Sequence, residues 1–282
     1  MEVAERIRSH GASLTSAERR VAEAILAAPQ AVGFGTVADL ARAADVGAAS
    51  VVRLATKLGF EGYSDLQQCV QRDLTRQLRP AAERIHDTVT GSRSDHAAAE
   101  LSNVRATLEG LDEAALEQLV ERLSDLSRSV AIISGDASAG VCHQFTYQLH
   151  QLRPGVSSIR GSEVTVRREL ALLDEDATVV VIDLRRYEQW VLDAHRIVHD
   201  RGIWSAGLTD SVLSPIAAIS AVTFLVGASS MGPFDSHVGT LALLNLIAID
   251  VATSLRQSAT ERLGVVEAVW SEGRSLTDGS TT

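Results

Sequence analysis

A short stretch of the chain carries side chains that can contact the base edges and phosphates of a DNA duplex. Arg53 can donate two hydrogen bonds to a guanine or a phosphate, and Lys57 can neutralise a phosphate. Ser50 can donate to either group, and a small alanine can lie against a thymine methyl group. We therefore expect a contact surface for double-stranded DNA that consists of Thr36, Ala48, Ala49, Ser50, Arg53 and Lys57.

The surrounding residues predict a helix-turn-helix that holds those side chains outward. Ala41 is small enough for two helices to approach closely, and Asp45 stands where the turn needs a left-handed backbone, which aspartate tolerates. Gly47 leaves the second helix without a side-chain cap. The alternative is an ordinary helical hairpin in which Arg53 and Lys57 are only solvated. The apolar residues of the predicted motif are Leu40, Ala44, Val46, Val51 and Leu54.

The flanking sequence is helical as well, and it resembles a known family. Apolar spacing predicts helices over 15–29 and 63–78. Residues 15–75 resemble the N-terminal domain of the RpiR family of bacterial transcription regulators, most clearly in VVRLATKLGFEGYSDL at 51–66. This resemblance implies a DNA-binding domain followed by a sugar isomerase (SIS) domain, which has a flavodoxin-like fold and binds phosphosugars. Gly47 departs from the hydroxyl residue that is usual before the recognition helix.

Composition and charge restrict the class of protein. The 282 residues are 45% hydrophobic and 22% charged, as is typical of globular domains. The formal net charge is −10, but residues 1–80 carry +1, so the acidity belongs to the remainder of the chain. Because salt screens charges beyond about 10 Å, the local charge decides DNA binding. We find no apolar run of roughly 20 residues and no secretory signal, and therefore expect a cytoplasmic protein without a membrane partner.

From residue 130 onward, short apolar runs alternate with amphipathic helical segments. This alternation predicts a parallel sheet with helices on both faces. The fold we expect is an all-α helix-turn-helix domain followed by an α/β three-layer sandwich with a parallel five-stranded sheet, SIS-like and flavodoxin-like. The predicted strands are 130–134, 156–159, 178–183, 204–208 and 221–226. The predicted helices are 141–151, 164–173, 188–201, 212–217, 237–255 and 260–270, after two helices within 97–126 that are broken at Gly110.

The expected domain boundaries follow changes in composition. Pro, Gly and Ser accumulate after the first helical region and predict a linker there. The predicted division is a helix-turn-helix domain at 1–78, a linker at 79–96, a SIS-like sensing and oligomerisation domain at 97–275, and a disordered tail at 276–282.

Ligands of open parallel sheets bind beyond the carboxyl ends of the strands, so we expect an effector site in those loops. The resemblance implies a phosphate cradle of the type SxSGxT after the third strand, but the chain has DLRRYE at 183–188. Arg185 and Arg186 could replace the cradle by pairing with an anion, or could form surface ion pairs. Three interpretations stay open: another anionic effector, a conventional effector bound unusually, or none. The candidate residues are Gly135, Ser138, Asp183, Arg185, Arg186, Tyr187, Thr209, Ser230 and His237.

The sequence contains no motif that requires an enzyme or a cofactor. His195 and His199 are spaced for a metal, but no third ligand is evident and an exposed helix face explains them. No nucleophile elbow, phosphate-binding loop or full dinucleotide fingerprint is present. We therefore expect a regulator without a cofactor or metal that acts as a homodimer or homotetramer on a palindromic operator. The alternative is an enzyme resembling sugar-phosphate isomerases, with an accessory helical domain.

Overall fold

The computed structural model of this chain describes residues 3, 6–7, 10, 13–27, 32–33, 35–78, 80–85, 92–212 and 214–273. The chain divides into two compact units. The first comprises Met1–Thr90 together with Met231–Phe234, and the second comprises Gly91–Ser230 together with Asp235–Thr282. The two units are described separately below.

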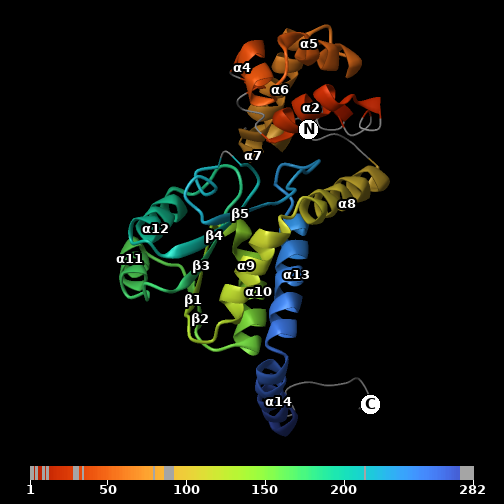
Figure 1. Ribbon diagram of the computed structural model, residues 1–282. Helices are drawn as coiled ribbons and strands as arrows, with labels where there is room; N and C mark the ends of the chain where they lie inside the picture. Colours follow the sequence, from red (N-terminus) through yellow and green to blue (C-terminus); the bar gives the residue numbers. More distant parts are fainter. Residues whose placement is uncertain are drawn as a thin grey trace. The chain divides into compact units, whose positions relative to one another are not determined.

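The first unit is helical throughout its described residues (Figure 1). Its elements are α2 (Ser16–Ala27), α4 (Val37–Ala43), α5 (Ala48–Lys57), α6 (Tyr63–Leu78) and α7 (Ala81–Arg84). The predicted apolar positions form its core, where Leu54 and Ala55 of α5 are fully buried and Leu40, Ala41 and Ala44 are 5% exposed.

The second unit contains a five-stranded parallel sheet, which confirms the predicted fold. The strand order is β2-β1-β3-β4-β5. The chain adds β2 on one side of β1 and then β3, β4 and β5 on the other side, so the strand order reverses between β1 and β3. The strands are β1 (Val130–Ser134), β2 (Val156–Ile159), β3 (Thr178–Ile182), β4 (Trp204–Thr209) and β5 (Val222–Leu225). The helices are α8 (Arg93–Glu109), α9 (Glu113–Ser124), α10 (Ala139–Leu152), α11 (Glu163–Ala171), α12 (Gln189–Asp200), α13 (Val238–Ser254) and α14 (Arg256–Gly273), with a 3₁₀ turn, η3, at Asp136–Ser138.

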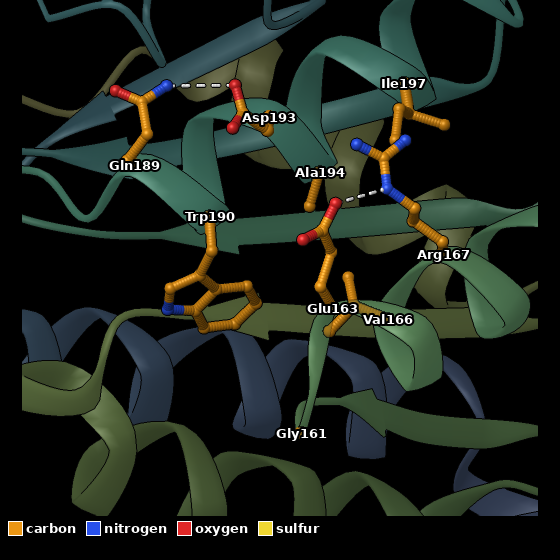
Figure 2. Close-up of a pocket in the computed structure, with 9 residues that line it drawn as sticks. All are labelled: Gly161, Glu163, Val166, Arg167, Gln189, Trp190, Asp193, Ala194 and Ile197. Carbon is orange, nitrogen blue, oxygen red and sulfur yellow. Dashed lines mark hydrogen bonds and ion pairs between the residues drawn. The ribbon is translucent and has the colours of Figure 1, made fainter.

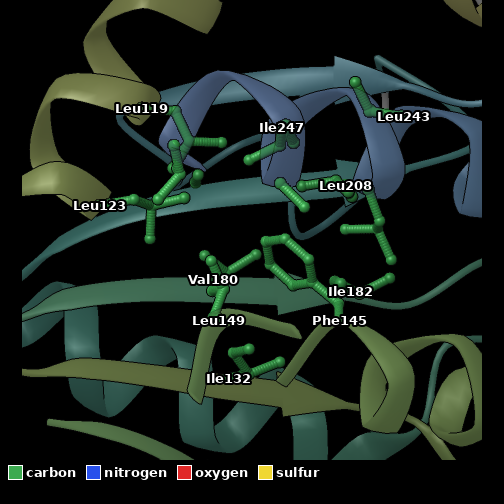
Figure 3. Packing of buried hydrophobic residues seen from close by; sticks show 14 of the residues in the cluster. Leu119, Leu123, Ile132, Phe145, Leu149, Val180, Ile182, Leu208, Leu243 and Ile247 are labelled. Atoms are coloured by element: carbon green, nitrogen blue, oxygen red, sulfur yellow. The ribbon is translucent and has the colours of Figure 1, made fainter. Parts of the chain in front are cut away.

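Alternate residues of the central strands build a core on each face of the sheet. Ile132 and Val180 face α9, α10 and α13 (Figure 3). Ile133 and Val181 face α11 and α12, which cover the opposite side (Figure 1). The strands are therefore apolar on both faces, as expected for a parallel sheet between two helical layers.

Three sequence expectations need correction at element boundaries. Residues 81–84 and 93–96 of the predicted linker are helical, in α7 and at the start of α8. The Ser92 side chain accepts from the Asp95 N–H, and this capping box starts α8 earlier than the apolar pattern indicated. The described residues within 212–217 form turns instead of the predicted helix. The predicted tail lies outside the described residues.

No single helix among the described residues is both long and apolar enough to cross a bilayer; α13 and α14 meet the length and composition requirement only as a pair, and the chain bends by 103° between them. The same residues contain no group of three or more His, Cys, Asp or Glu side chains arranged to hold a metal ion. His195 corrects another expectation, because it is fully buried, with its Nε2 2.9 Å from Ser205 Oγ.

Candidate DNA-binding surface and effector site

The turn before α5 has the predicted left-handed residue. Asp45 adopts φ = 50°, and the Val46 N–H donates to the Ala41 carbonyl at 2.9 Å across the turn. Arg20 donates to the carbonyls of Ala44 and Asp45, each at 3.2 Å, and so ties the turn to α2. These contacts fix the angle at which α5 leaves the turn.

The exposed side of α5 only partly matches the predicted DNA-contact set. Exposed side chains recur at positions i, i+1, i+4, i+5 and i+8, which share one helix face. Ser50 corrects the expectation of a free hydroxyl, because it is 7% exposed and its Oγ accepts from Arg53 Nη2 at 2.8 Å. Its role is to orient the guanidinium of Arg53 along the helix surface. The exposed face consists of Ala48, Ala49, Val52, Arg53 and Thr56.

Lys57 does not present a free ammonium group on that face. Its Nζ donates to Glu18 Oε2 at 2.9 Å and to the Ser13 carbonyl, so it joins α5 to the start of α2. The Thr15 N–H donates to the same Glu18 oxygen at 2.8 Å. That backbone hydrogen bond, with Lys57 as the second cause, lowers the pKa of Glu18 to about 2. The structure therefore corrects the expectation that Lys57 is a phosphate contact on the outer face.

We expect Lys57→Ala to destabilise the first unit by about 1–2 kcal/mol, because Glu18 is 8% exposed and would lose its cation. The lowered pKa of Glu18 stabilises the fold above about pH 4.5, and this contribution disappears as the pH falls towards 2. The destabilisation caused by Lys57→Ala should therefore be evident at pH 7. Hydrogen exchange of α2 and α5 in the intact chain measures it. Arg42→Ala, which removes an exposed ion pair with Asp39, is the control; equal protection in both variants would contradict the prediction.

Thr36 and Gly47 start the two helices of the motif in different ways. Thr36 is exposed and forms a complete capping box with Asp39, so its hydroxyl is already hydrogen-bonded at the start of α4. Gly47 provides no side-chain cap for α5, as predicted, and a Cβ at this position would meet no atom within 4 Å.

The stretch that follows α5 supports the helix from behind. Gly59 ends α5 with φ = 82°, and the Phe60 N–H donates to the Ala55 carbonyl at 3.0 Å, as in a Schellman motif. Tyr63 donates from its hydroxyl to the Val32 carbonyl at 3.3 Å. Gly59, Phe60 and Tyr63, which belong to the stretch that resembles the family hallmark, therefore have structural roles in this unit.

In the second unit, the loops after β1 and β3 meet at the point where the strand order reverses. Gly135 is buried beneath two carboxylates: a Cβ at this position would lie 2.5 Å from Asp183 Oδ1 and 2.9 Å from Glu188 Oε1. The absence of a side chain at Gly135 thus allows both carboxylates to approach the β1 loop.

Backbone and indole donors hold these two carboxylates. Glu188 Oε1 accepts from the Asp136 N–H, and Glu188 Oε2 accepts from Trp190 Nε1 at 2.6 Å. Asp183 accepts from the Leu184 N–H at 3.0 Å and from the Glu188 N–H at 2.8 Å. Burial, assisted by the charges of Glu188 and Asp210, raises the pKa of Asp183 to about 7.

Arg185 is part of the protein's internal ion-pair network. Its Nε and Nη2 donate to Asp235 Oδ1 at 3.0 and 2.8 Å, and its Nη1 lies 3.5 Å from Asp210 Oδ2. Nη2 also donates to the Ala228 carbonyl at 3.0 Å. With a side chain only 11% exposed, Arg185 does not offer its charge to an effector in this conformation, which corrects the sequence expectation.

The other predicted effector residues are dispersed. Arg186 is exposed at φ = 64°, and Tyr187 donates to Asp210 Oδ1 at 3.0 Å. Ser138 and Thr209 are fully buried, and their hydroxyls have no hydrogen-bond partner among the described residues. Ser230 is exposed, and His237 is partly buried; burial lowers the pKa of His237.

Sequence reasoning missed four residues that shape the site. Glu188 ends the stretch that replaces the phosphate cradle, and its place at the start of α12 brings its side chain to the β1 loop. Asp210 directly follows β4 at the carboxyl edge, a position that could have identified it. No local signal marked Asp235 or Trp190, because their partners are distant in sequence or depend on side-chain rotamers.

Two family models match the chain. The helix-turn-helix domain of the rpiR family matches residues 1–77, and the SIS domain matches residues 126–250. The chain is an RpiR-type regulator with a SIS domain. The second match covers the five-stranded sheet and the loops that hold Asp183 and Glu188.

Comparison with individual proteins agrees with this assignment. The RpiR-type regulator described here is 27% identical over 258 residues to the HTH-type transcriptional regulator HexR of Pseudomonas aeruginosa, with 88% of each chain covered. Its fold matches the sugar isomerase domain of an RpiR transcription factor from Sphaerobacter thermophilus, at 23% identity and a TM-score of 0.59, over 62% of this chain and 97% of that one. NanR of Vibrio vulnificus, solved in complex with ManNAc-6P, matches at 22% identity and a TM-score of 0.56, over 95% and 97% of the two chains.

Proposed function

We propose that this regulator binds an operator through α5 and that a small sugar-derived anion, bound at the carboxyl ends of β1 and β3, controls the binding. The observation that carries the proposal is the geometry of α5. A left-handed residue sets the turn, and one exposed face presents small side chains around Arg53. Such a face suits the major groove, because alanines allow close approach while arginine reads a base or a phosphate.

The effector part of the proposal is supported by position. The loops after β1 and β3, which are joined by the hydrogen bond that the Asp136 N–H donates to Glu188, lie at the strand-order reversal, where open α/β sheets bind ligands. NanR, which shares this fold, was solved with a phosphorylated amino sugar. A sugar-derived effector is therefore the class of ligand that we propose for this chain.

We further propose that two or more copies act together in the bacterial cytoplasm, where operators are found. One helix-turn-helix contacts too few base pairs for tight specific binding, so a palindromic operator with half-sites about 34 Å apart, or a multiple of that distance, is expected. We do not propose catalysis. The carboxylates at the β1 and β3 loops accept hydrogen bonds from backbone N–H groups and the Trp190 indole, and we propose that they control ligand binding. Turnover of an aldose or ketose phosphate by the intact protein would support the enzyme alternative.

The DNA-binding proposal is tested with fragments of the regulator's own promoter region at several salt concentrations. We expect Arg53→Ala to weaken specific binding by about 1–3 kcal/mol and to relax the preference at one base position. Arg105→Ala, which removes an equally exposed arginine from α8, is the matched control and should leave binding unchanged. Equal affinities of wild type and Arg53→Ala for every fragment would contradict the docking of α5.

A further inference from the structure

We infer that the effector is a carboxylate-bearing sugar derivative, and that its carboxylate takes the place that the Glu188 side chain fills in this structure. The inference rests on the proposed function, because it assumes that an effector binds at these loops. It adds the chemical class of that effector and identifies Glu188 as an internal competitor for the same donors.

The place of the Glu188 carboxylate is a site for one planar, two-oxygen anion. One oxygen accepts from the Asp136 N–H and the other from Trp190 Nε1. Arg160 forms an ion pair with the Asp136 side chain at 3.1 Å, next to the backbone N–H that Glu188 accepts from. A ligand that displaces Glu188 should supply acceptors for both donors, because the partly buried Trp190 N–H in particular would otherwise lose its hydrogen bond. A free carboxylate reproduces the two hydrogen bonds.

A phosphate monoester suits these loops less well. The described loop after β3 offers no serine or threonine hydroxyl that could replace the usual cradle. Asp183, 3% exposed, stays fixed beside the position, because two backbone N–H groups hold it. Exchanging one carboxylate for another leaves the local charge nearly unchanged, whereas a phosphate dianion brings an additional negative charge next to Asp183 and Asp210.

A pocket for the sugar body begins beside the same tryptophan. It lies between α11 and α12, with a volume of about 310 Å³ (Figure 2). Val166 and Ala194 form part of its apolar lining, and the Trp190 ring lies along one side, while Glu163 and Asp193 bring carboxylates that can accept from hydroxyls. The volume is at the lower end of the range for small-molecule sites, which suits a single sugar unit.

Glu188 can leave its place without unfolding the helix that it starts. It is the N-cap residue of α12, but its side chain makes no capping hydrogen bond. The residue is partly exposed, so rotation of the side chain moves the carboxylate into solvent. Because the ligand-ready form requires this rotation, the apparent affinity for the effector is the intrinsic affinity multiplied by the fraction of molecules in which Glu188 has left this place.

Chemical rescue tests the inference without knowledge of the natural effector. In the intact chain, Glu188→Ala should lower Tm, and acetate or propionate should restore about 2–4 °C of it while changing wild type little. Inorganic phosphate at the same concentration and ionic strength should restore less. Glu109→Ala, which removes an exposed glutamate from α8, controls for general salt effects. Rescue by phosphate equal to that by acetate, or no rescue by either, would overturn the inference.

A second variant covers the case in which Glu188→Ala folds poorly. Glu188→Gln keeps the shape but loses the charge, and it should bind hexonates and hexuronates at least about tenfold more tightly than wild type, as measured by calorimetry, with hexose 6-phosphates gaining less. A greater gain for the phosphates would reverse the assignment of class. Both variants should shift operator DNA as wild type does without ligand. If wild type itself does not shift operator DNA, the proposed function is refuted. If DNA binding is intact but the rescue fails, only this inference is refuted.

Discussion

Replacing Arg185 by alanine is expected to destabilise the second unit by about 3–5 kcal/mol. Arg185 is the shared cation of Asp210 and Asp235, whose side chains are 6% and 16% exposed. Its removal leaves two largely buried carboxylates without that partner and frees the Ala228 carbonyl of one donor. The cost of an uncompensated buried charge exceeds that of any exposed ion pair in the described residues.

Tryptophan fluorescence during urea unfolding measures this loss selectively. All three tryptophans, at positions 190, 204 and 270, belong to the second unit, so the signal follows that unit alone. Arg186→Ala is the matched control, because Arg186 is exposed and should change the free energy of unfolding by less than about 0.5 kcal/mol. Similar, small effects of both substitutions would show that the Arg185 network contributes little.

Asp183 is expected to make the second unit less stable as the pH rises. The pKa of its carboxyl group is about 7 in the folded chain against 3.8 as the ordinary value, so the folded state holds a proton that the unfolded state has lost. The resulting stabilisation is complete below about pH 4 and disappears as the pH rises through 7. The full shift corresponds to about 4 kcal/mol, at about 1.4 kcal/mol per pH unit. Glu188, Asp210 and the Cys142 thiol are the titratable groups that act on or respond to this carboxyl group.

Comparison with Asp183→Asn isolates that contribution. The free energy of unfolding of the variant should exceed that of wild type by an amount that increases from pH 5 to pH 7 and levels off by pH 8. His195, whose burial lowers its pKa to about 4, titrates with the opposite sign but is common to both proteins. Asp200→Asn, which alters an exposed carboxylate at the end of α12, is the control. Parallel pH profiles for wild type and Asp183→Asn would contradict the prediction.

The architecture of the second unit could be predicted closely because the central strands β1 and β3 are mostly apolar and buried, and because strands and helical segments alternate along the chain. The strand at 130–134 has the predicted bounds, and β5 is shorter by one residue at each end than the predicted 221–226. The turn residue Asp45 was predictable for a related reason, since few residue types accept a left-handed backbone. The predicted helix at 212–217 failed because a short apolar pattern does not distinguish a helix from successive turns.

The details of the effector site could not be predicted in the same way. Arg185 and Arg186 are adjacent and chemically identical, yet one is held by Asp210 and Asp235 and the other is exposed. Which of the two turns inward depends on the path of the loop, including the left-handed backbone at Arg186. The sequence shows that Asp183 and Glu188 stand where the family cradle has hydroxyls, but only the folded loops show that backbone and indole donors hold both carboxylates.

The stretch after α5 supports the helix, whereas other residues determine which promoter is bound, so the two properties can be inherited separately. Gly59 forms the helix cap of α5, Phe60 is buried beside it, and Tyr63 donates to the Val32 carbonyl. The exposed residues of α5 lie earlier, between Ala48 and Thr56. Paralogues that share the stretch after α5 therefore support the helix in the same way. Each can evolve its own set of target genes by exchanging the few exposed residues of α5. The part of the family hallmark after α5 therefore indicates how the helix is mounted, whereas Val52, Arg53 and Thr56, which also lie within 51–66, belong to the exposed face.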